Sequence, residues 1–393
     1  MNSTIRKISI AIKWIGILLF MLFTTALFIA SLPYALFTTI YDFPERTPFR
    51  ESTWFNPYEH VSFDDISAWK TTNFHGHTKA WGTMTDGHSD HLLYDSVYRA
   101  LGYHTPGISN YQFIDTTFRE TTGYVPCYEH GYNLWKRHHV CIGAKSVTWL
   151  DFIFGQSIHH KQTMLDHIKS TVEVLAIAHP TFRGSFDPED FSLLASYDCI
   201  EVLNHYRISE PQWDSALSSG YPAWIVGNDD THNALSEGET GVCWTNIFAP
   251  GSANGQTITS SLKQGKAFGV TGTRAKTDIR PIMLHISNQD TLHIEVNKKA
   301  AKVELIGQSG KVLRRDTMVQ QLSYRLQSTD TYVRAKIYGD SCTLWMNPIM
   351  RGNGDKPSGP IPNMAKTYTY RGMWWIAYVL IAFTVFRMKR RKN

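Results

Sequence analysis

The sequence predicts an α/β protein, and three observations lead to that prediction. Between about residues 71 and 273, short apolar segments rich in β-branched residues alternate with stretches of helical pattern. After about residue 276 the pattern changes to short segments with period-two alternation, which is typical of antiparallel strands. An apolar run without charged residues lies near each end of the chain. We therefore expect an α/β domain, a small β-module and an apolar helix at each terminus.

The N-terminal apolar run predicts a transmembrane helix over residues 14–36. No charged residue occurs from Trp14 to Tyr41, and the run is long enough to cross ~30 Å of hydrocarbon. The alternative is a cleaved signal peptide, because small residues near 31–35 offer a processing site.

The C-terminal apolar run predicts a second transmembrane helix over residues 372–387. The run is short for a span, but Arg371 and Arg387 bracket it and can extend to the interface. An aromatic end accompanies it, formed by Tyr368, Tyr370, Trp374 and Trp375. Basic residues lie outside both runs, so the positive-inside rule places both termini in the cytoplasm and the rest of the chain outside it.

Net charge excludes a large nucleic-acid footprint. The chain of 393 residues has 39 basic and 34 acidic residues, a formal charge of +5. Eight of the basic residues lie at the two ends: Arg6, Lys7, Lys13, Arg387, Lys389, Arg390, Arg391 and Lys392. The remaining 31 basic residues leave the body with a net charge of −3, which does not suit binding to a phosphate backbone.

The alternating region predicts one domain over residues 45–275. Its segments 172–179, 198–204 and 222–228 are apolar throughout, as buried parallel strands are. Strand–helix alternation over this length predicts a barrel-like fold. The β-module follows over residues 276–348, and a Gly/Pro-rich linker over 349–371 leads to the C-terminal run. The module has no chemical motif, and any protein partner it binds is unknown.

Histidines point to a metal site. His75 and His77 are two residues apart, so on a strand both imidazoles project to one face. Further acidic and histidine residues follow at or near the ends of apolar segments: Asp86, Glu129, His138, His139, His179, Asp230 and His232. In a (β/α) barrel such ends meet on one face, where these residue types bind zinc, manganese or iron.

The ordered series FHGHT, TDG, YEH, HHV, AHP and DDTH resembles the polymerase-and-histidinol-phosphatase (PHP) superfamily of metal-dependent phosphoesterases. The resemblance implies a distorted (β/α)7 TIM-like barrel that holds two or three divalent metal ions. It implies that His75, His77 and Asp230 bind one metal. It implies a second metal on Glu129 and His179, completed by either His138 or His139, and a third on Asp86 and His232.

The activity implied by the resemblance is hydrolysis of a phosphoester through attack of metal-bound hydroxide, and the expected partners are a small-molecule or phosphoester substrate and the membrane. Arg183 and Lys79 follow ligand motifs closely and could pair with a substrate phosphate. The stretch Ser109-Asn110-Tyr111 stands where the family has Thr-Asp-His, which puts the third metal in doubt. Two alternatives stay open: a partly decayed, non-catalytic metal-binding scaffold of the cell envelope, and a metal-dependent amidohydrolase.

Other histidines invite simpler interpretations. His88, His91 and His104 lie close enough in sequence to substitute for the missing third-site ligand. The pair at residues 159 and 160 lies in a polar stretch and is expected on the surface, and the histidines at 285 and 293 are expected to be structural.

Overall fold

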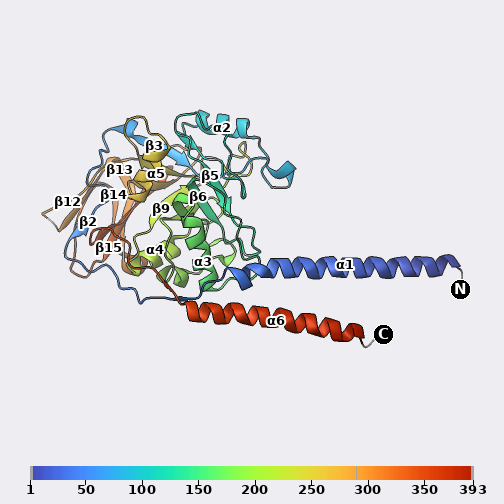
Figure 1. The fold of residues 1–393 in the computed structure, drawn as a ribbon. Coiled ribbons are helices and arrows are strands. Elements are labelled where there is room, and N and C mark those ends of the chain that lie inside the picture. The colour runs from blue at the N-terminus through green and yellow to red at the C-terminus, as the bar shows by residue number, and fades with distance from the viewer. Residues whose placement is uncertain (1–2, 289, 391–393) are drawn as a thin grey trace.

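The computed structural model describes residues 3–288 and 290–390, and it has a mixed α/β body with one long helix at each end of the chain (Figure 1). Arg391 and Lys392 of the C-terminal basic cluster lie outside the described residues. Four shorter α-helices belong to the body: α2 (His91–Ala100), α3 (Ile158–Lys169), α4 (Glu210–Ser218) and α5 (Gly255–Lys263). Five 3₁₀ helices, η1 to η5, cover Ile66–Ala68, Trp81–Thr83, Phe182–Gly184, Pro188–Ser192 and Gln308–Gly310.

A five-stranded sheet forms the buried centre of the α/β region, in the order β5-β6-β7-β8-β9. Its strands are β5 (Cys127–His130), β6 (His139–Ala144), β7 (Val172–Ile177), β8 (Cys199–Asn204) and β9 (Trp224–Asn228). The last three are parallel and almost wholly buried, so the prediction of buried parallel strands is confirmed. By contrast, β6 is antiparallel to both β5 and β7.

The second sheet has eleven strands and joins the β-rich segment to the α/β region. Its strands are β2 (Trp54–Phe55), β3 (Trp69–Asn73), β4 (Thr105–Pro106), β10 (Cys243–Phe248), β11 (Ala267–Thr271), β12 (Pro281–Ser287), β13 (Thr291–Gly307), β14 (Lys311–Arg325), β15 (Tyr332–Tyr338), β16 (Thr343–Met346) and β17 (Ile349–Arg351). Strands β12 to β16 pair antiparallel, as their alternation predicts. Because β16 also pairs with β11, these strands continue the sheet that contains β3 and β10.

The expected closed barrel is not formed by the described residues. The backbone bridges between the two sheets are isolated, Gly76 with Thr231 and Tyr111 with Glu129, and no ladder of the described residues connects the sheets. The first bridge follows the ends of β3 and β9, and the second joins the segment after β4 to β5. Since β4 is only two residues long, it cannot supply a continuous hydrogen-bonded ladder to β5. The wall around the centre is therefore interrupted where the sequence led us to expect closure.

The terminal helices are α1 (Ser3–Leu36) and α6 (Met364–Arg390), and they lie side by side, with the start of α1 and the end of α6 both pointing away from the body (Figure 1). They contain two candidate membrane spans, Ala11–Leu36 with a mean hydropathy of 2.4 and Met364–Arg387 with 1.2. Neither span is buried in the body, which suggests association with a membrane. The helix α6 begins at Met364, whereas the sequence led us to expect a helix from residue 372.

Contacts between α1 and α6, and between the segments that connect them to the body, fix how the two helices leave the body. The Ser31 hydroxyl is hydrogen-bonded to the Tyr378 hydroxyl at 2.9 Å, and the ring of Phe28 packs edge-on against Tyr378. Where the helices reach the body, β1 (Tyr41–Asp42) pairs antiparallel with β18 (Ile361–Pro362). These interactions join segments more than 300 residues apart in the chain.

The helix α3 anchors this pair to the body. The Tyr34 ring packs against His160 at 5.1 Å, and the Tyr41 hydroxyl donates to Asp166 Oδ2 at 2.7 Å. The expectation of a surface histidine pair is wrong for His160, which is buried. Its Nδ1 accepts from the backbone N–H of Ser157 and so caps the first turn of α3. Local polarity misled the prediction, because His160 is covered by the rings of Phe152, of Tyr34 in α1 and of Tyr370 in α6.

Candidate metal centre

The candidate ligands gather at one edge of the five-stranded sheet. Since β5 and β7 are both antiparallel to β6, the carboxyl ends of β5 and β7 lie at the edge where β6 begins. Glu129 lies near the end of β5, His138 precedes β6, and His179 follows β7. Two residues beyond β9, Asp230 joins them. Because β6 runs antiparallel to its neighbours, His138 before β6 lies at the same edge as Glu129 near the end of β5 and His179 after β7.

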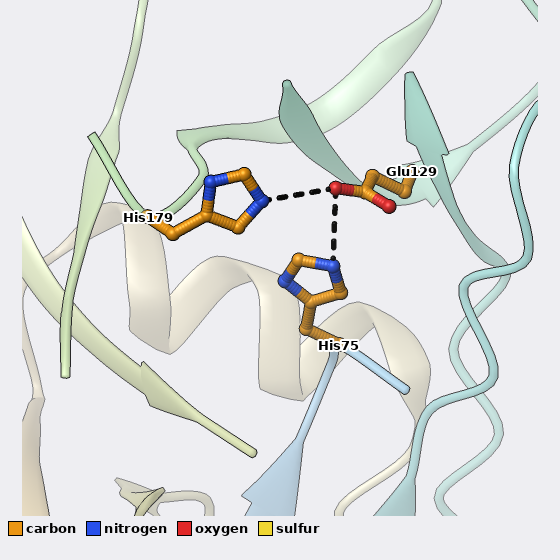
Figure 2. Close-up of side chains that lie close together, drawn as sticks. All are labelled: His75, Glu129 and His179. Carbon is orange, nitrogen blue, oxygen red and sulfur yellow. Dashed lines mark hydrogen bonds and ion pairs between the residues drawn. The ribbon is translucent and has the colours of Figure 1, made fainter. Parts of the chain in front are cut away.

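One group of possible ligands consists of His75, Glu129 and His179 (Figure 2). Glu129 Oε1 lies 3.3 Å from His75 Nε2 and 3.2 Å from His179 Nε2. All three side chains are buried. One imidazole nitrogen of His75 and one of His179 point toward the same carboxylate oxygen of Glu129, as Figure 2 shows. Such a set of two imidazoles and a carboxylate could hold a divalent metal ion.

A second group consists of His75, His77 and Asp230. Asp230 Oδ1 lies 3.2 Å from His75 Nε2 and 3.2 Å from His77 Nε2. His77 Nε2 is also 3.2 Å from Glu129 Oε2, so Glu129 contacts histidines of both groups. His75 belongs to both groups through Nε2, because its Nδ1 is paired with Glu201, so His75 can serve only one of two neighbouring metal positions.

Unsatisfied polar atoms test whether these residues fit a metal. His75 Nε2, His77 Nε2 and Glu129 Oε2 are buried and lie 3.2–3.3 Å from neighbouring ligand atoms without a well-directed hydrogen bond, and His77 Nδ1 has no hydrogen-bond partner among the described residues. A buried polar atom without a partner costs about 1–3 kcal/mol, so proteins rarely leave several together. A divalent cation would accept lone pairs of His75 Nε2, His77 Nε2 and Glu129 Oε2, whereas the second ring nitrogen of His77 cannot bind the same ion. The donor set therefore fits a metal better than it fits a purely structural network.

Electrostatics within the group point the same way. Burial raises the pKa of Glu129, but the imidazoles of His138 and His75 outweigh it and hold that pKa well below the usual range. Burial lowers the pKa of His77, but Asp230 and Glu129 outweigh it and raise the pKa to about 9. The buried carboxylates thus need positive charge beside them. Either a protonated imidazole or a bound cation supplies such charge, and metal binding releases the protons.

Two of these residues have backbone conformations that favour glycine. His179 has φ 27° and Asp230 has φ 52°, both in the left-handed region. Such conformations in non-glycine residues concentrate at functional sites, where tertiary contacts hold them. The backbone N–H of Asp230 donates to the carbonyl of His75 at 2.9 Å, which fixes the turn after β9 against the HGH segment. These turns bring the side chains to the centre of the group.

The structure distinguishes between His138 and His139. His138 Nδ1 lies 2.5 Å from Glu129 Oε1, within the group. His139 is the first residue of β6, and its ring lies near His130 at 5.5 Å and Phe186 at 5.9 Å. Neighbouring residues of an extended chain project to opposite faces. His138 therefore joins the candidate ligands, and His139 does not.

Asp86 and His232 lie on the solvent side of the group. His232 Nε2 is 3.4 Å from Asp86 Oδ2, and its hydrogen bond lowers the pKa of Asp86 to about 2. The His232 ring stacks on His77 at 4.4 Å, whereas 61% of the Asp86 side chain is exposed. The two residues are next to the buried groups but do not by themselves complete a third set of ligands.

The Ser109-Asn110-Tyr111 stretch braces the HGHT segment. The Gly76 N–H donates to the Ser109 hydroxyl at 3.1 Å, and the Thr78 N–H donates to Asn110 Oδ1 at 2.8 Å. The Tyr111 ring stacks on His77 at 4.6 Å. Position and orientation of His77 thus depend on residues that replace the expected ligands.

The histidines considered as substitutes do not join the candidate ligands. His104 Nε2 is paired with the Ala253 carbonyl at 2.8 Å, and the His91 ring packs near Phe118. His88 is exposed, and its backbone N–H donates to the carbonyl of His232.

Two cations near the group are available to a ligand. Lys79 and Arg183 are exposed, and neither makes an ion pair within the described part of the chain. The Arg183 guanidinium lies over the ring of Phe182 at 5.6 Å, and that ring packs against His179 at 5.6 Å. Arg183 is therefore attached to the same turn that presents a candidate ligand.

Sequence reasoning missed Glu201, which lies within β8 and is fully buried. Its Oε1 lies 2.9 Å from His75 Nδ1 and accepts from Asn228 Nδ2 at 2.9 Å. Its Oε2 accepts from the His179 N–H at 2.8 Å and from Asn204 Nδ2 at 3.0 Å. The signal was a single acidic residue inside the apolar segment CIEVLN. Glu201 turns the other nitrogen of His75, Nε2, toward the candidate ligands.

Comparisons with known proteins add no assignment. No protein-family model matches the chain, and no curated protein or solved structure matches it. The side chains of the centre are therefore the basis on which a function can be argued.

Proposed function

We propose that the protein is a membrane-anchored, metal-dependent hydrolase that cleaves a phosphoester. The observation that carries this proposal is the pair of buried groups that share His75, with several ligand atoms left unpaired. The proposal has two metal ions, one on His75, His77 and Asp230 and one on Glu129, His179 and His138, because His75 Nε2 can bind only one of them. The Asp86–His232 pair offers too few ligands for a third ion to be part of the proposal.

The strand arrangement supports a distorted seven-stranded barrel of the PHP type. The strands β3 to β9 follow one another around the centre, and the bridges Gly76–Thr231 and Tyr111–Glu129 lie where a barrel would close. The HGH segment and the turn after β9 then face each other, as the resemblance implies. The proposal needs this placement of side chains, and it does not need continuous hydrogen bonding around the barrel.

Each group of residues has a separate task in the proposed reaction. Divalent ions bound there would supply Lewis-acid chemistry that lowers the pKa of water and neutralises phosphoryl oxygens. Glu129 contacts both histidine groups and holds them close together. Glu201 orients His75 by accepting from its Nδ1. The exposed cations Lys79 and Arg183 are suited to bind phosphoryl oxygens that approach from solvent.

Membrane topology enters the proposal as well. The start of α1 and the end of α6 lie at the end of the pair away from the body, and basic residues cluster at both ends of the sequence. The positive-inside rule then favours cytoplasmic termini and an extracytoplasmic body.

The test uses the full chain purified in detergent. We expect about two zinc, manganese or iron ions per chain by mass spectrometry, and hydrolysis of p-nitrophenyl phosphate or its bis-ester. The variant His77→Ala should lose at least about 100-fold in rate, because it removes a ligand held by both Glu129 and Asp230. His60→Ala, on an exposed histidine far from the centre, is the matched control. Folded protein without metal above trace would contradict the proposal.

A non-catalytic metal-binding scaffold is the second candidate, and one observation favours it. Ser109-Asn110-Tyr111 replaces potential ligands with residues that brace the HGHT segment. In that case chelation would lower the melting temperature, while no phosphoester in a broad panel would turn over. Cleavage of amides with no cleavage of phosphoesters would instead favour an amidohydrolase.

A further inference from the structure

The α1–α6 pair projects from the same edge of the body that carries the candidate metal centre. The far edge of the sheet is where β6 ends and β7 begins, since the Lys145 N–H donates to the Thr171 carbonyl. The helix α3 ends at that far edge just before β7, so it begins near the centre. Tyr34 packs near the start of α3, on His160, and Tyr41 contacts Asp166 further along. From Tyr41 back to Tyr34 the chain therefore runs toward the edge of the sheet that carries the candidate metal centre, and α1 leaves the body at that edge.

The loops at this edge expose large apolar side chains. Trp81, Phe113, Tyr132, Leu134, Trp135 and Trp149 are each between 41% and 61% exposed, and we call these six residues the aromatic rim. The Trp81 ring packs edge-on against Phe113 and Trp149, at 6.0 Å from each. In Figure 1 the loops that carry them lie on the side of the body from which α1 and α6 extend. Exposed apolar patches of this kind mark sites of interaction.

The aromatic rim is continuous with the centre on one side. Trp81 Nε1 donates to the carbonyl of Tyr111 at 2.8 Å, and the Tyr111 ring stacks on His77. Cations accompany it, since Lys136 lies 5.5 Å above the Tyr111 ring. A group bound near His77 would therefore be within reach of the rim.

On the other side, the aromatic rim is continuous with the membrane helices. The loop from Trp149 to Gly155 leads to Tyr34, whose hydroxyl donates to the Gly155 carbonyl at 3.5 Å. Tyr34 stacks on Phe154 at 6.3 Å and packs against Trp374 of α6 at 5.6 Å. Tyrosine and tryptophan side chains prefer the headgroup level of a bilayer. Contacts therefore run from the aromatic rim to the aromatic residues at the body ends of both helices.

We infer that the aromatic rim lies on the bilayer that α1 and α6 enter, and that the substrate is a phosphoester of a lipid headgroup in that bilayer. The inference rests on the proposed hydrolase. In the reaction, an oxygen of water bonds to phosphorus, the bond from phosphorus to the ester oxygen breaks, and a proton passes to the departing oxygen. No oxidant or reductant is required.

The position of the rim can be measured without activity. All five cysteines are buried, so a cysteine placed at Met84, which is 86% exposed beside Trp81, can be labelled with a nitroxide in the full chain. In vesicles, Met84→Cys should show high access to oxygen and low access to a water-soluble nickel chelate. The matched control is Met318→Cys, 65% exposed on β14, which should show the reverse. Equal access of both labels to the chelate would overturn the placement of the rim.

The substrate class is tested with vesicles that contain phosphatidic acid and phosphatidylglycerol, beside water-soluble bis-p-nitrophenyl phosphate. The double variant Leu134→Ser/Trp149→Ser should lower lipid hydrolysis at least about 10-fold and leave the soluble reaction unchanged. Ile66→Ser, equally exposed near the start of β3, should change neither. Hydrolysis of the soluble ester alone, or equal loss on both substrates, would overturn the lipid assignment. Failure of the wild type on every ester, with the Met84 label in lipid, would refute the hydrolase and uphold the rim.

Discussion

Replacing Glu201 with glutamine tests the buried network behind the centre. All four interactions of this carboxylate involve donors: His75 Nδ1, Asn228 Nδ2, the His179 N–H and Asn204 Nδ2. Glutamine has nearly the same volume, but one of its two positions is an NH₂ group, which cannot accept a hydrogen bond. Glu201→Gln would therefore leave two buried donors facing another donor, without creating a cavity.

The structure sets the size of the effect. Each buried donor without an acceptor costs about 1–3 kcal/mol, so two of them should lower the free energy of unfolding by about 2–6 kcal/mol. If the side chain turns its NH₂ toward His75, the imidazole loses the partner that aims Nε2 at the candidate ligands. Loss of such a partner lowers metal affinity by about 10–100-fold.

Urea unfolding and zinc titration of the full chain measure both quantities. Glu173→Gln is the matched control, because Glu173 is part-exposed on β7 and pairs with the surface lysines Lys145 and Lys263. We expect its unfolding energy to change by less than about 1 kcal/mol and its zinc affinity to stay the same. Equal behaviour of the two variants would refute the role of Glu201 as a positioning residue.

Three further predictions concern stability and local geometry. Burial lowers the pKa of His160 to about 4, so as the pH falls this histidine is protonated in the unfolded chain before it is protonated in the folded one. Its contribution to the free energy of unfolding should be constant above about pH 7 and fall by about 3 kcal/mol by pH 4, and the variant His160→Gln should lack this fall. Asp229→Asn should destabilise the protein by about 2–4 kcal/mol in thermal unfolding, because the carboxylate accepts three backbone N–H groups and the Tyr98 hydroxyl, and in asparagine one of the two accepting oxygens becomes an NH₂ group that faces donors. Gly76→Ala should abolish metal binding in a titration, since its Cβ would lie 2.1 Å from the Tyr94 hydroxyl, whereas Gly155→Ala, with no atom within 4 Å, should bind metal as the wild type does.

Much of the architecture follows from local pattern. Both faces of β7, β8 and β9 are buried in the protein. Such strands read as continuous apolar runs of a few residues, so the sequence predicts them. The long terminal helices follow from hydropathy for the same reason. Candidate ligands could be found because polar residues at the ends of buried strands are conspicuous in a one-dimensional pattern.

Tertiary structure decided what local pattern could not. His138 and His139 are indistinguishable in sequence, and only the register of β6 against β5 directs one toward Glu129 and the other toward His130. Whether Glu201 acts at the centre depends on a partner 126 residues away in the chain.

The way in which strands and helices are joined also depends on tertiary structure. Pairing of β16 with β11 makes the β-rich segment part of the main sheet, which no alternation pattern within either strand specifies. The start of α6 at Met364 follows from the pairing of β1 with β18 and from contacts of α6 with α3, both of which involve residues distant from α6 in the sequence. Sequence by itself determined which segments are buried strands and membrane-length helices, because burial and period are properties of neighbouring residues. The tertiary structure decided which side chains meet and which edge the helices leave from, because these depend on contacts between residues that are distant in the chain.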